Sequence, residues 1–136
     1  MKIRWLGHAG FKISFPDPSD SAITRNIFID TWLDGPTFPS DAKDEMNDAD
    51  LILVTHGHFD HSAGAPVVYN NSKENGKDPK IVVIFELANY FIKHHSVPEE
   101  GTTRMNKGCP LDFGFCTIIM VGADHSSGCP GKDGEM

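Results

Sequence analysis

The sequence has no apolar run long enough to cross a bilayer, which argues against a membrane-spanning protein. Its first five residues, MKIRW, also lack the apolar stretch of a signal peptide. Cysteine is scarce, and its positions form no close pair, which is typical of a reduced compartment rather than of a disulfide framework. These positions are Cys109, Cys116 and Cys129. We therefore expect a cytoplasmic protein.

Basic side chains are few, because 12 Lys and Arg residues stand against 19 Asp and Glu residues, for a net charge of −7. This charge disfavours tight binding to phosphate backbones and to anionic membrane surfaces. The sequence also lacks a Gly-rich phosphate loop, and Ser126–Ser127 does not have the pattern of a nucleophile elbow. We therefore expect neither a nucleic acid nor a membrane as partner, and this composition is compatible with a small-molecule substrate.

The apolar pattern indicates strands that alternate with a few helices in a chain of 136 residues, which is the length of one domain. No internal repeat or linker is evident. The expected strands are residues 2–6, 11–15, 27–29, 51–55 and 81–85, with a hairpin or long strand over 113–122. The expected helices are 61–69, with Asp60 as N-cap, and 86–95. Residues 31–50 and 70–79 are expected as loops, with one helical turn near 44–46. The predicted fold class is α/β.

The densest chemical signal is the segment THGHFDH, which directly follows the apolar run 51–54. It places His56, His58, Asp60 and His61 at the end of a predicted buried strand, where ligand sites of α/β sheets gather. Imidazole and carboxylate together are the ligand set that suits zinc, iron or manganese. Gly57 is expected to relieve crowding between two ligand histidines. The segment predicts a metal site, with His56 and His58 pointing one way and Asp60 and His61 another.

A second strand end brings His125 into the same prediction. It follows the apolar run 117–121, and a further imidazole is needed to complete a three-ligand metal sphere. The neighbouring Asp124 is equally compatible with orienting a ligand histidine and with capping a turn.

Other chemistry-bearing residues fit ordinary structural roles better. His8 and Asp30 also follow strands, but a buried, hydrogen-bonded imidazole and a turn or cap carboxylate are the favoured interpretations. His94 and His95 are expected at an exposed helix end. Cys129 follows His125 at a spacing seen in zinc sites, but without a cysteine pair it is expected to be a free thiol.

At the level of motifs the chain resembles the metallo-β-lactamase superfamily, whose hallmark His-x-His-x-Asp-His stands at residues 56–61. The segments IRWLGHAGF at 3–11, FIDT at 28–31 and ADHSS at 123–127 look like the branch related to the ascorbate-6-phosphate lactonase. The resemblance covers residues 2–128.

This resemblance implies a four-layer αββα sandwich that holds one or two metal ions, Zn²⁺ or Mn²⁺, at its sheet edges. His56, His58 and His125 would hold one ion, and Asp60 and His61 the second. A complete member adds a bridging aspartate and a last histidine downstream, and Asp133 follows too soon to be that aspartate. We therefore expect residues 1–136 to correspond to the first half of such a domain, incomplete at its C-terminus.

The function this implies is metal-dependent hydrolysis of an ester, lactone or phosphoester bond by a metal-activated water. Asp60 would be the catalytic residue, because it would both bind the second ion and orient the water. Two alternatives stay open. The chain could be a truncated, inactive metal-binding half-domain, or one whose site a partner chain completes, for instance in a homo-oligomer.

Overall fold

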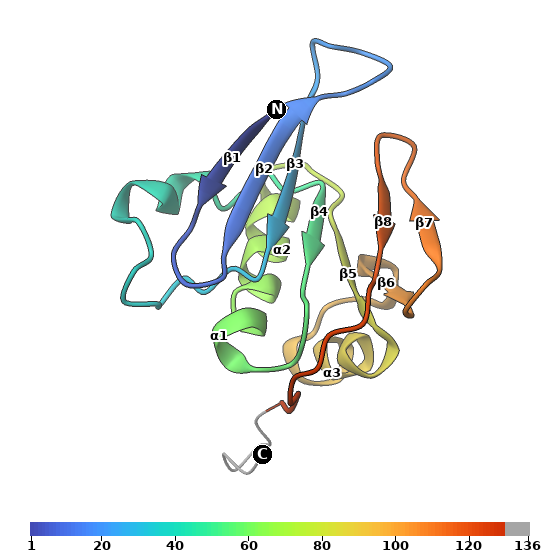
Figure 1. The fold of residues 1–136 in the computed structure, drawn as a ribbon. Helices are drawn as coiled ribbons and strands as arrows, with labels where there is room; N and C mark the ends of the chain where they lie inside the picture. Colours follow the sequence, from blue (N-terminus) through green and yellow to red (C-terminus); the bar gives the residue numbers. More distant parts are fainter. Residues whose placement is uncertain (130–136) are drawn as a thin grey trace.

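The computed structural model describes residues 1–129, which form one mixed six-stranded sheet, a set of helices and a separate hairpin (Figure 1). The strands are β1 (Lys2–Trp5), β2 (Phe11–Pro16), β3 (Thr24–Ile29), β4 (Leu51–Leu53), β5 (Lys80–Ile84), β6 (Thr102–Met105), β7 (Pro110–Asp112) and β8 (Thr117–Ile119). The α-helices are α1 (Phe59–Ser62), α2 (Ala65–Glu74) and α3 (Phe85–His95), and the 3₁₀ helices are η1 (Ser40–Glu45) and η2 (Glu99–Gly101). The α/β fold class expected from the sequence is confirmed.

The sheet changes direction at β3. Strands β1, β2 and β3 form an antiparallel meander, whereas β3, β4, β5 and β6 pair in parallel, in the spatial order β1-β2-β3-β4-β5-β6. Parallel strands need crossover connections, and α2 and α3 lie in two of them. The carboxyl ends of β3 and β4 therefore meet at one edge of the sheet.

One face of the sheet packs against the helices. Phe28, Ile52 and Ile81 stand side by side across three strands, and each is at most 1% exposed. They pack in one cluster with Val68 of α2 and Phe91 of α3. The apolar runs of β3, β4 and β5 also place Ile27, Leu51 and Val82 on the opposite face, so the sequence pattern indicates burial but does not determine which face meets the helices.

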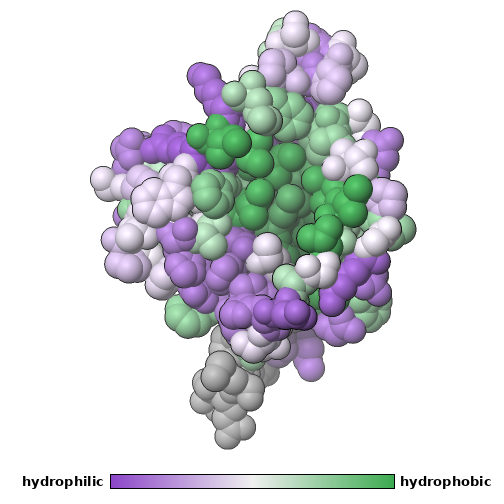
Figure 2. Space-filling model, in the orientation of Figure 1, coloured by the Kyte–Doolittle hydropathy of each residue, from purple (hydrophilic) through white to green (hydrophobic). Residues whose placement is uncertain are grey.

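The opposite face is only partly covered. Leu51 and Val82 on this face pack against the β7–β8 hairpin, which supplies Ile118 and its neighbours. Beyond the hairpin, Ile3 on β1 is 61% exposed although it stands in register with Ile13 of β2. Figure 2 shows this side of the molecule as a broad hydrophobic patch. Contiguous exposed apolar patches are uncommon on monomeric soluble proteins.

The expectation of a hairpin or long strand over 113–122 is met by a hairpin, formed by β7 and β8. Ile119 on β8 and Val121 after it are 57% and 74% exposed. These apolar side chains stay exposed because few of the described elements cover this side of the sheet.

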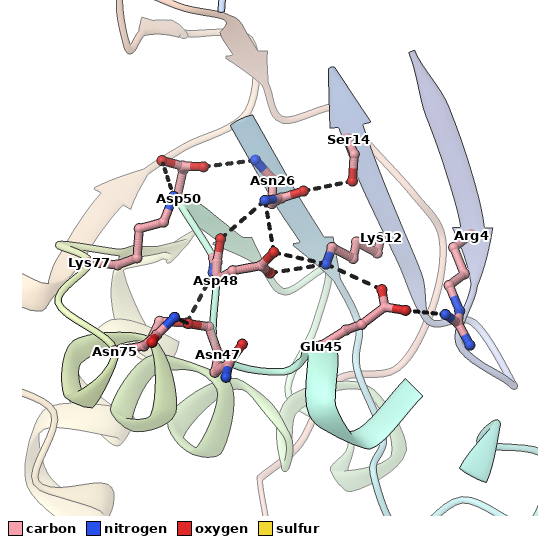
Figure 3. Close-up of polar contacts among 12 residues, drawn as sticks. Arg4, Lys12, Ser14, Asn26, Glu45, Asn47, Asp48, Asp50, Asn75 and Lys77 are labelled. Carbon is pink, nitrogen blue, oxygen red and sulfur yellow. Dashed lines mark hydrogen bonds and ion pairs between the residues drawn. The ribbon is translucent and has the colours of Figure 1, made fainter. Parts of the chain in front are cut away.

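A polar network ties the long connection between β3 and β4 to the helix-side face of the meander (Figure 3). The ammonium of Lys12, only 6% exposed, lies 3.3 Å from a carboxylate oxygen of Glu45 and 3.0 Å from one of Asp48. Arg4 also pairs with Glu45, and the Asn26 amide donates to Asp48. A buried ammonium needs such partners because its desolvation is costly. The network therefore anchors η1 and the residues after it on the sheet.

The helices differ from the sequence expectation in two places. Asp60 is not an N-cap, because α1 begins at Phe59 and His58 takes the cap position. The helix expected over 61–69 is interrupted after Ser62 and restarts as α2, with Pro66 in its first turn, where a missing N–H costs nothing. α2 then continues to Glu74, through residues expected as loop.

Strand β6 was missed because its sequence, TTRM, is mostly polar. Asp133, discussed above from the sequence, lies outside the described residues. Within residues 1–129, no helix is both long and apolar enough to span a membrane.

Candidate metal centre

Four segments meet at the edge of the sheet where β3 and β4 end. They are the turn after β1 with His8, the end of β3 with Asp30, the segment after β4 with the histidine motif, and the residues after β8 with His125. The described residues contain two groups of metal-ligating side chains here, and in each group one ligand atom per residue lies within 4.8 Å of the others.

The first group consists of three imidazoles from two distant segments: His56, His58 and His125. His56 Nε2 lies 3.0 Å from His58 Nδ1, and the His125 ring is 4.7 Å from the His56 ring and 5.1 Å from the His58 ring, between centroids. A cluster of imidazoles whose nitrogens converge fits the coordination of zinc or a similar cation. The three residues are those that the sequence singled out for one ion.

The surroundings of His56 keep it in the form that binds metal. Burial, together with repulsion from His61 and His58, lowers the pKa of His56, so the neutral ring is favoured. The Thr55 hydroxyl lies 2.6 Å from Asp30 Oδ2 and 3.0 Å from His56 Nδ1. If the hydroxyl donates to the carboxylate, it accepts from His56 Nδ1–H, and the Nε2 lone pair is left for a cation.

The second group consists of His8, Asp60 and His61. His8 Nε2 lies 3.0 Å from Asp60 Oδ2, and His61 Nε2 lies 3.9 Å from the same oxygen. The two groups adjoin, because the rings of His56 and His61 have centroids 4.1 Å apart. Imidazoles and a carboxylate fit zinc, iron or manganese.

Asp30 lies behind the second group and is 3% exposed. Its Oδ2 is 2.8 Å from His61 Nδ1, and its Oδ1 accepts the Thr55 amide at 2.8 Å. The backbone of Asp30 is left-handed, with φ +44°, a conformation that aspartate tolerates better than most residues. Asp30 therefore orients His61. The sequence had favoured a different role for it, that of a carboxylate that closes a turn.

Gly57 is needed for a reason other than the one expected. A Cβ at this position would lie 2.6 Å from Cys129 Sγ and 3.2 Å from the Gly128 carbonyl oxygen. Ser127 Oγ also accepts the Gly57 amide at 3.1 Å. The glycine therefore lets the segment that carries His125 lie against the histidine motif.

The remaining histidines and cysteines take no part in the two groups. His94 and His95 are exposed at the end of α3, as expected, and contact Tyr90 through their rings. Asp124 is exposed. Cys129 is a free thiol, as expected, and burial raises its pKa.

The sequence profile of the beta-lactamase superfamily domain matches residues 25–135. Among solved structures, that of Igni18, titled a novel metallo hydrolase from Ignicoccus hospitalis, is similar with a TM-score of 0.66 at 21% identity, over 98% of this chain and 51% of that one. This likeness shows a shared fold. Because the domain profile matches most of the chain, the chain belongs to the metallo-β-lactamase superfamily, as its histidine motif implied.

Curated relatives are similar over the whole chain. A UPF0173 metal-dependent hydrolase from Paracoccus denitrificans is 37% identical over 138 residues, which is 100% of this chain and 54% of the relative. Another, from Dinoroseobacter shibae, is 38% identical over the same shares, and one from Koribacter versatilis is 32% identical over 98% and 51%. The chain spans about half the length of the curated relatives it matches.

Proposed function

We propose that this chain carries the metal centre of a metal-dependent hydrolase. The observation that supports this most directly is the convergence of the first group, in which ligand nitrogens of His56, His58 and His125 lie within 4.8 Å of one another although His125 is 67 or more positions from the other two. His56, His58 and His125 would hold one ion, and Asp60 and His61 would contribute to a second, each being Zn²⁺ or Mn²⁺. The bound cation would supply water of lowered pKa and polarise the attacked bond.

Asp60 is the proposed catalytic residue. Its carboxylate side chain is 26% exposed, so it reaches both the ligand histidines and the solvent from which a water would come. A carboxylate at this place accepts a hydrogen bond from the attacking water and fixes its direction. Asp30, through His61, keeps the neighbouring ring in position.

The substrate we propose is a small molecule with an ester, lactone or phosphoester bond. Motif resemblance to the lactonase branch favours a lactone or a small phosphorylated compound. The net charge of −7 argues against nucleic acids and anionic membranes. A cytoplasmic location stays a prediction, as does the assignment of residues 1–136 to one domain.

The alternative is a half-domain that binds metal without turnover, or one that a second chain completes. The partly uncovered apolar face of the sheet, where Ile3 is 61% exposed, favours association with another chain, including a second copy.

The deciding experiment measures hydrolysis of p-nitrophenyl acetate and bis(p-nitrophenyl) phosphate with Zn²⁺ or Mn²⁺ added. His58→Ala and Asp60→Ala should each lower the rate by several orders of magnitude, because each removes a group from the centre. His94→Ala is the matched control, since His94 is exposed and takes no part in either group. A wild-type rate equal to that of free metal in buffer would reject the enzyme in favour of the half-domain.

A further inference from the structure

His8 lies in a turn whose backbone is held from several sides. Its φ is +47° and that of Gly7 is +87°. The His8 amide donates to the Thr37 hydroxyl at 3.0 Å, and the Trp5 indole N–H donates to the His8 carbonyl oxygen at 3.0 Å. Both peptide groups of this histidine are therefore fixed by side chains. A left-handed conformation is unfavourable for a residue with a Cβ, and such residues persist where the surroundings impose them.

The imidazole of His8 is directed at the second group. Its ring meets the Trp32 ring edge-on at 5.6 Å and the His61 ring at 5.1 Å, between centroids. Trp32 in turn meets Phe59 of the histidine motif at 5.6 Å. His8 Nε2 then lies 3.0 Å from Asp60 Oδ2. Aromatic contacts on one side and the carboxylate on the other define the position of the ring.

An ion pair alone does not account for this arrangement. The His8 side chain is 41% exposed and that of Asp60 26% exposed, and pairs in such surroundings contribute little to stability. The left-handed backbone of His8 is by contrast unfavourable for folding. A role in binding a ligand explains why the turn is built in this way.

The hydrogen bond between Asp30 and His61 points to a cation as that ligand. Asp30, 3% exposed, is 2.8 Å from His61 Nδ1, so the carboxylate holds the proton on that nitrogen. His61 Nε2 then presents its lone pair toward Asp60. A carboxylate that accepts from one nitrogen of an imidazole while the other nitrogen faces a ligand site is the usual arrangement behind a metal-binding histidine.

We infer that His8 is the third protein ligand of the second metal ion, so that residues of this chain alone supply a complete pair of sites. The second site takes His8 Nε2, a carboxylate oxygen of Asp60 and His61 Nε2, all within 4.8 Å. Three protein ligands that leave one position open are the pattern of a catalytic divalent site. This inference rests on the proposed metal centre and adds a protein ligand to its second ion, to which the sequence had assigned only Asp60 and His61.

The test is equilibrium dialysis of the whole chain against Zn²⁺, with bound metal counted by elemental analysis. Wild type should bind about two equivalents, as two three-ligand sites require. His8→Asn should bind about one, because asparagine tolerates the left-handed backbone but lacks the imidazole nitrogen. His58→Ala should also bind about one, from the other site, and His94→Ala should keep two.

The outcomes separate this inference from the proposed function. About one equivalent in wild type, or two in His8→Asn, would overturn the role of His8 and leave the first site standing. No bound metal in wild type would overturn both. Urea denaturation of the metal-free proteins checks that His8→Asn is folded. If it is not, His8→Gly replaces it, because glycine also adopts a positive φ and lacks the imidazole. The same loss of one equivalent is expected, and retention of both equivalents would contradict the role of His8.

Discussion

The carboxylate of Asp30 offers the sharpest test of how the centre is held, because its contribution can be measured without metal. It accepts three hydrogen bonds, from the Thr55 amide at 2.8 Å, from the Thr55 hydroxyl at 2.6 Å and from His61 Nδ1 at 2.8 Å. Thr55 is exposed, so water can replace its two bonds when the carboxylate is removed. The His61 side chain is only 15% exposed, so water would not readily replace the partner that its Nδ1–H loses.

The expected magnitudes follow from these contacts. In Asp30→Ala, a hydrogen bond between a buried donor and a charged group is lost, at about 2 kcal/mol. An alanine at φ +44° adds about 1 kcal/mol, for about 3 kcal/mol in all. In Asp30→Asn the backbone stays acceptable, and His61 can change tautomer to accept from the amide. That variant should lose only about 1 kcal/mol of unfolding free energy.

The same tautomer change predicts a second effect of Asp30→Asn. With its proton moved to Nε2, His61 no longer presents a lone pair to a cation, so metal affinity at the second group should fall by about 10- to 100-fold. Urea denaturation of chelator-treated protein measures the first effect, and calorimetric titration with Zn²⁺ the second. Asp34→Asn is the control, because Asp34 is exposed. Unfolding free energies of both Asp30 variants within about 0.5 kcal/mol of wild type would refute the reasoning.

Three further changes test other parts of the molecule. Phe28→Ala empties a fully buried position of the helix-side core and should cost about 3–5 kcal/mol in urea denaturation, so a cost below about 1 kcal/mol would contradict the assigned packing. Ile3→Lys places a charge on the uncovered sheet face and should reduce self-association in sedimentation velocity, whereas unchanged association would exclude that part of the face as the contact. Hydrogen bonds from Ser19 and Arg25 hold the pKa of Asp17 well below its usual range. Their stabilisation is therefore full above the unfolded-state pKa of about 4 and is lost as the pH falls toward the folded-state pKa. Asp17→Asn should show a weaker loss of stability between about pH 5 and pH 2, and a profile parallel to that of wild type would show that Asp17 is not responsible.

Strands and the motif were predictable because their signals are local. The run 51–54 is apolar without interruption, and its burial follows from that alone. The position of the histidine motif after this strand follows from the topology of α/β sheets. By contrast, β6 carries Thr102, Thr103 and Arg104 at its start, and although threonine favours strands, this segment has no apolar run that indicates a strand beside β5.

The roles of His8 and Asp30 were not predictable in the same way. Each depends on a left-handed backbone and on partners far along the chain: Thr37 and Asp60 for His8, and Thr55 for Asp30. The available signal was that both residues directly follow strands, as His56 does. The sequence alone did not show that the ends of β1, β3 and β4 lie close together, because this depends on the strand order of the whole sheet.

The change of sheet direction at β3 has a consequence for the order of folding. The β1–β2–β3 meander is built from contacts close in sequence, whereas β4 reaches β3 only after the long connection of residues 30–50. Loop closure makes such a distant pairing slower than local hairpins. His8 and Asp30 belong to the early unit and His61 to the late one, so the second group cannot assemble until the two units have joined. The Thr55 amide, which donates to Asp30, should gain protection from hydrogen exchange later during refolding than the amides paired between β1 and β2.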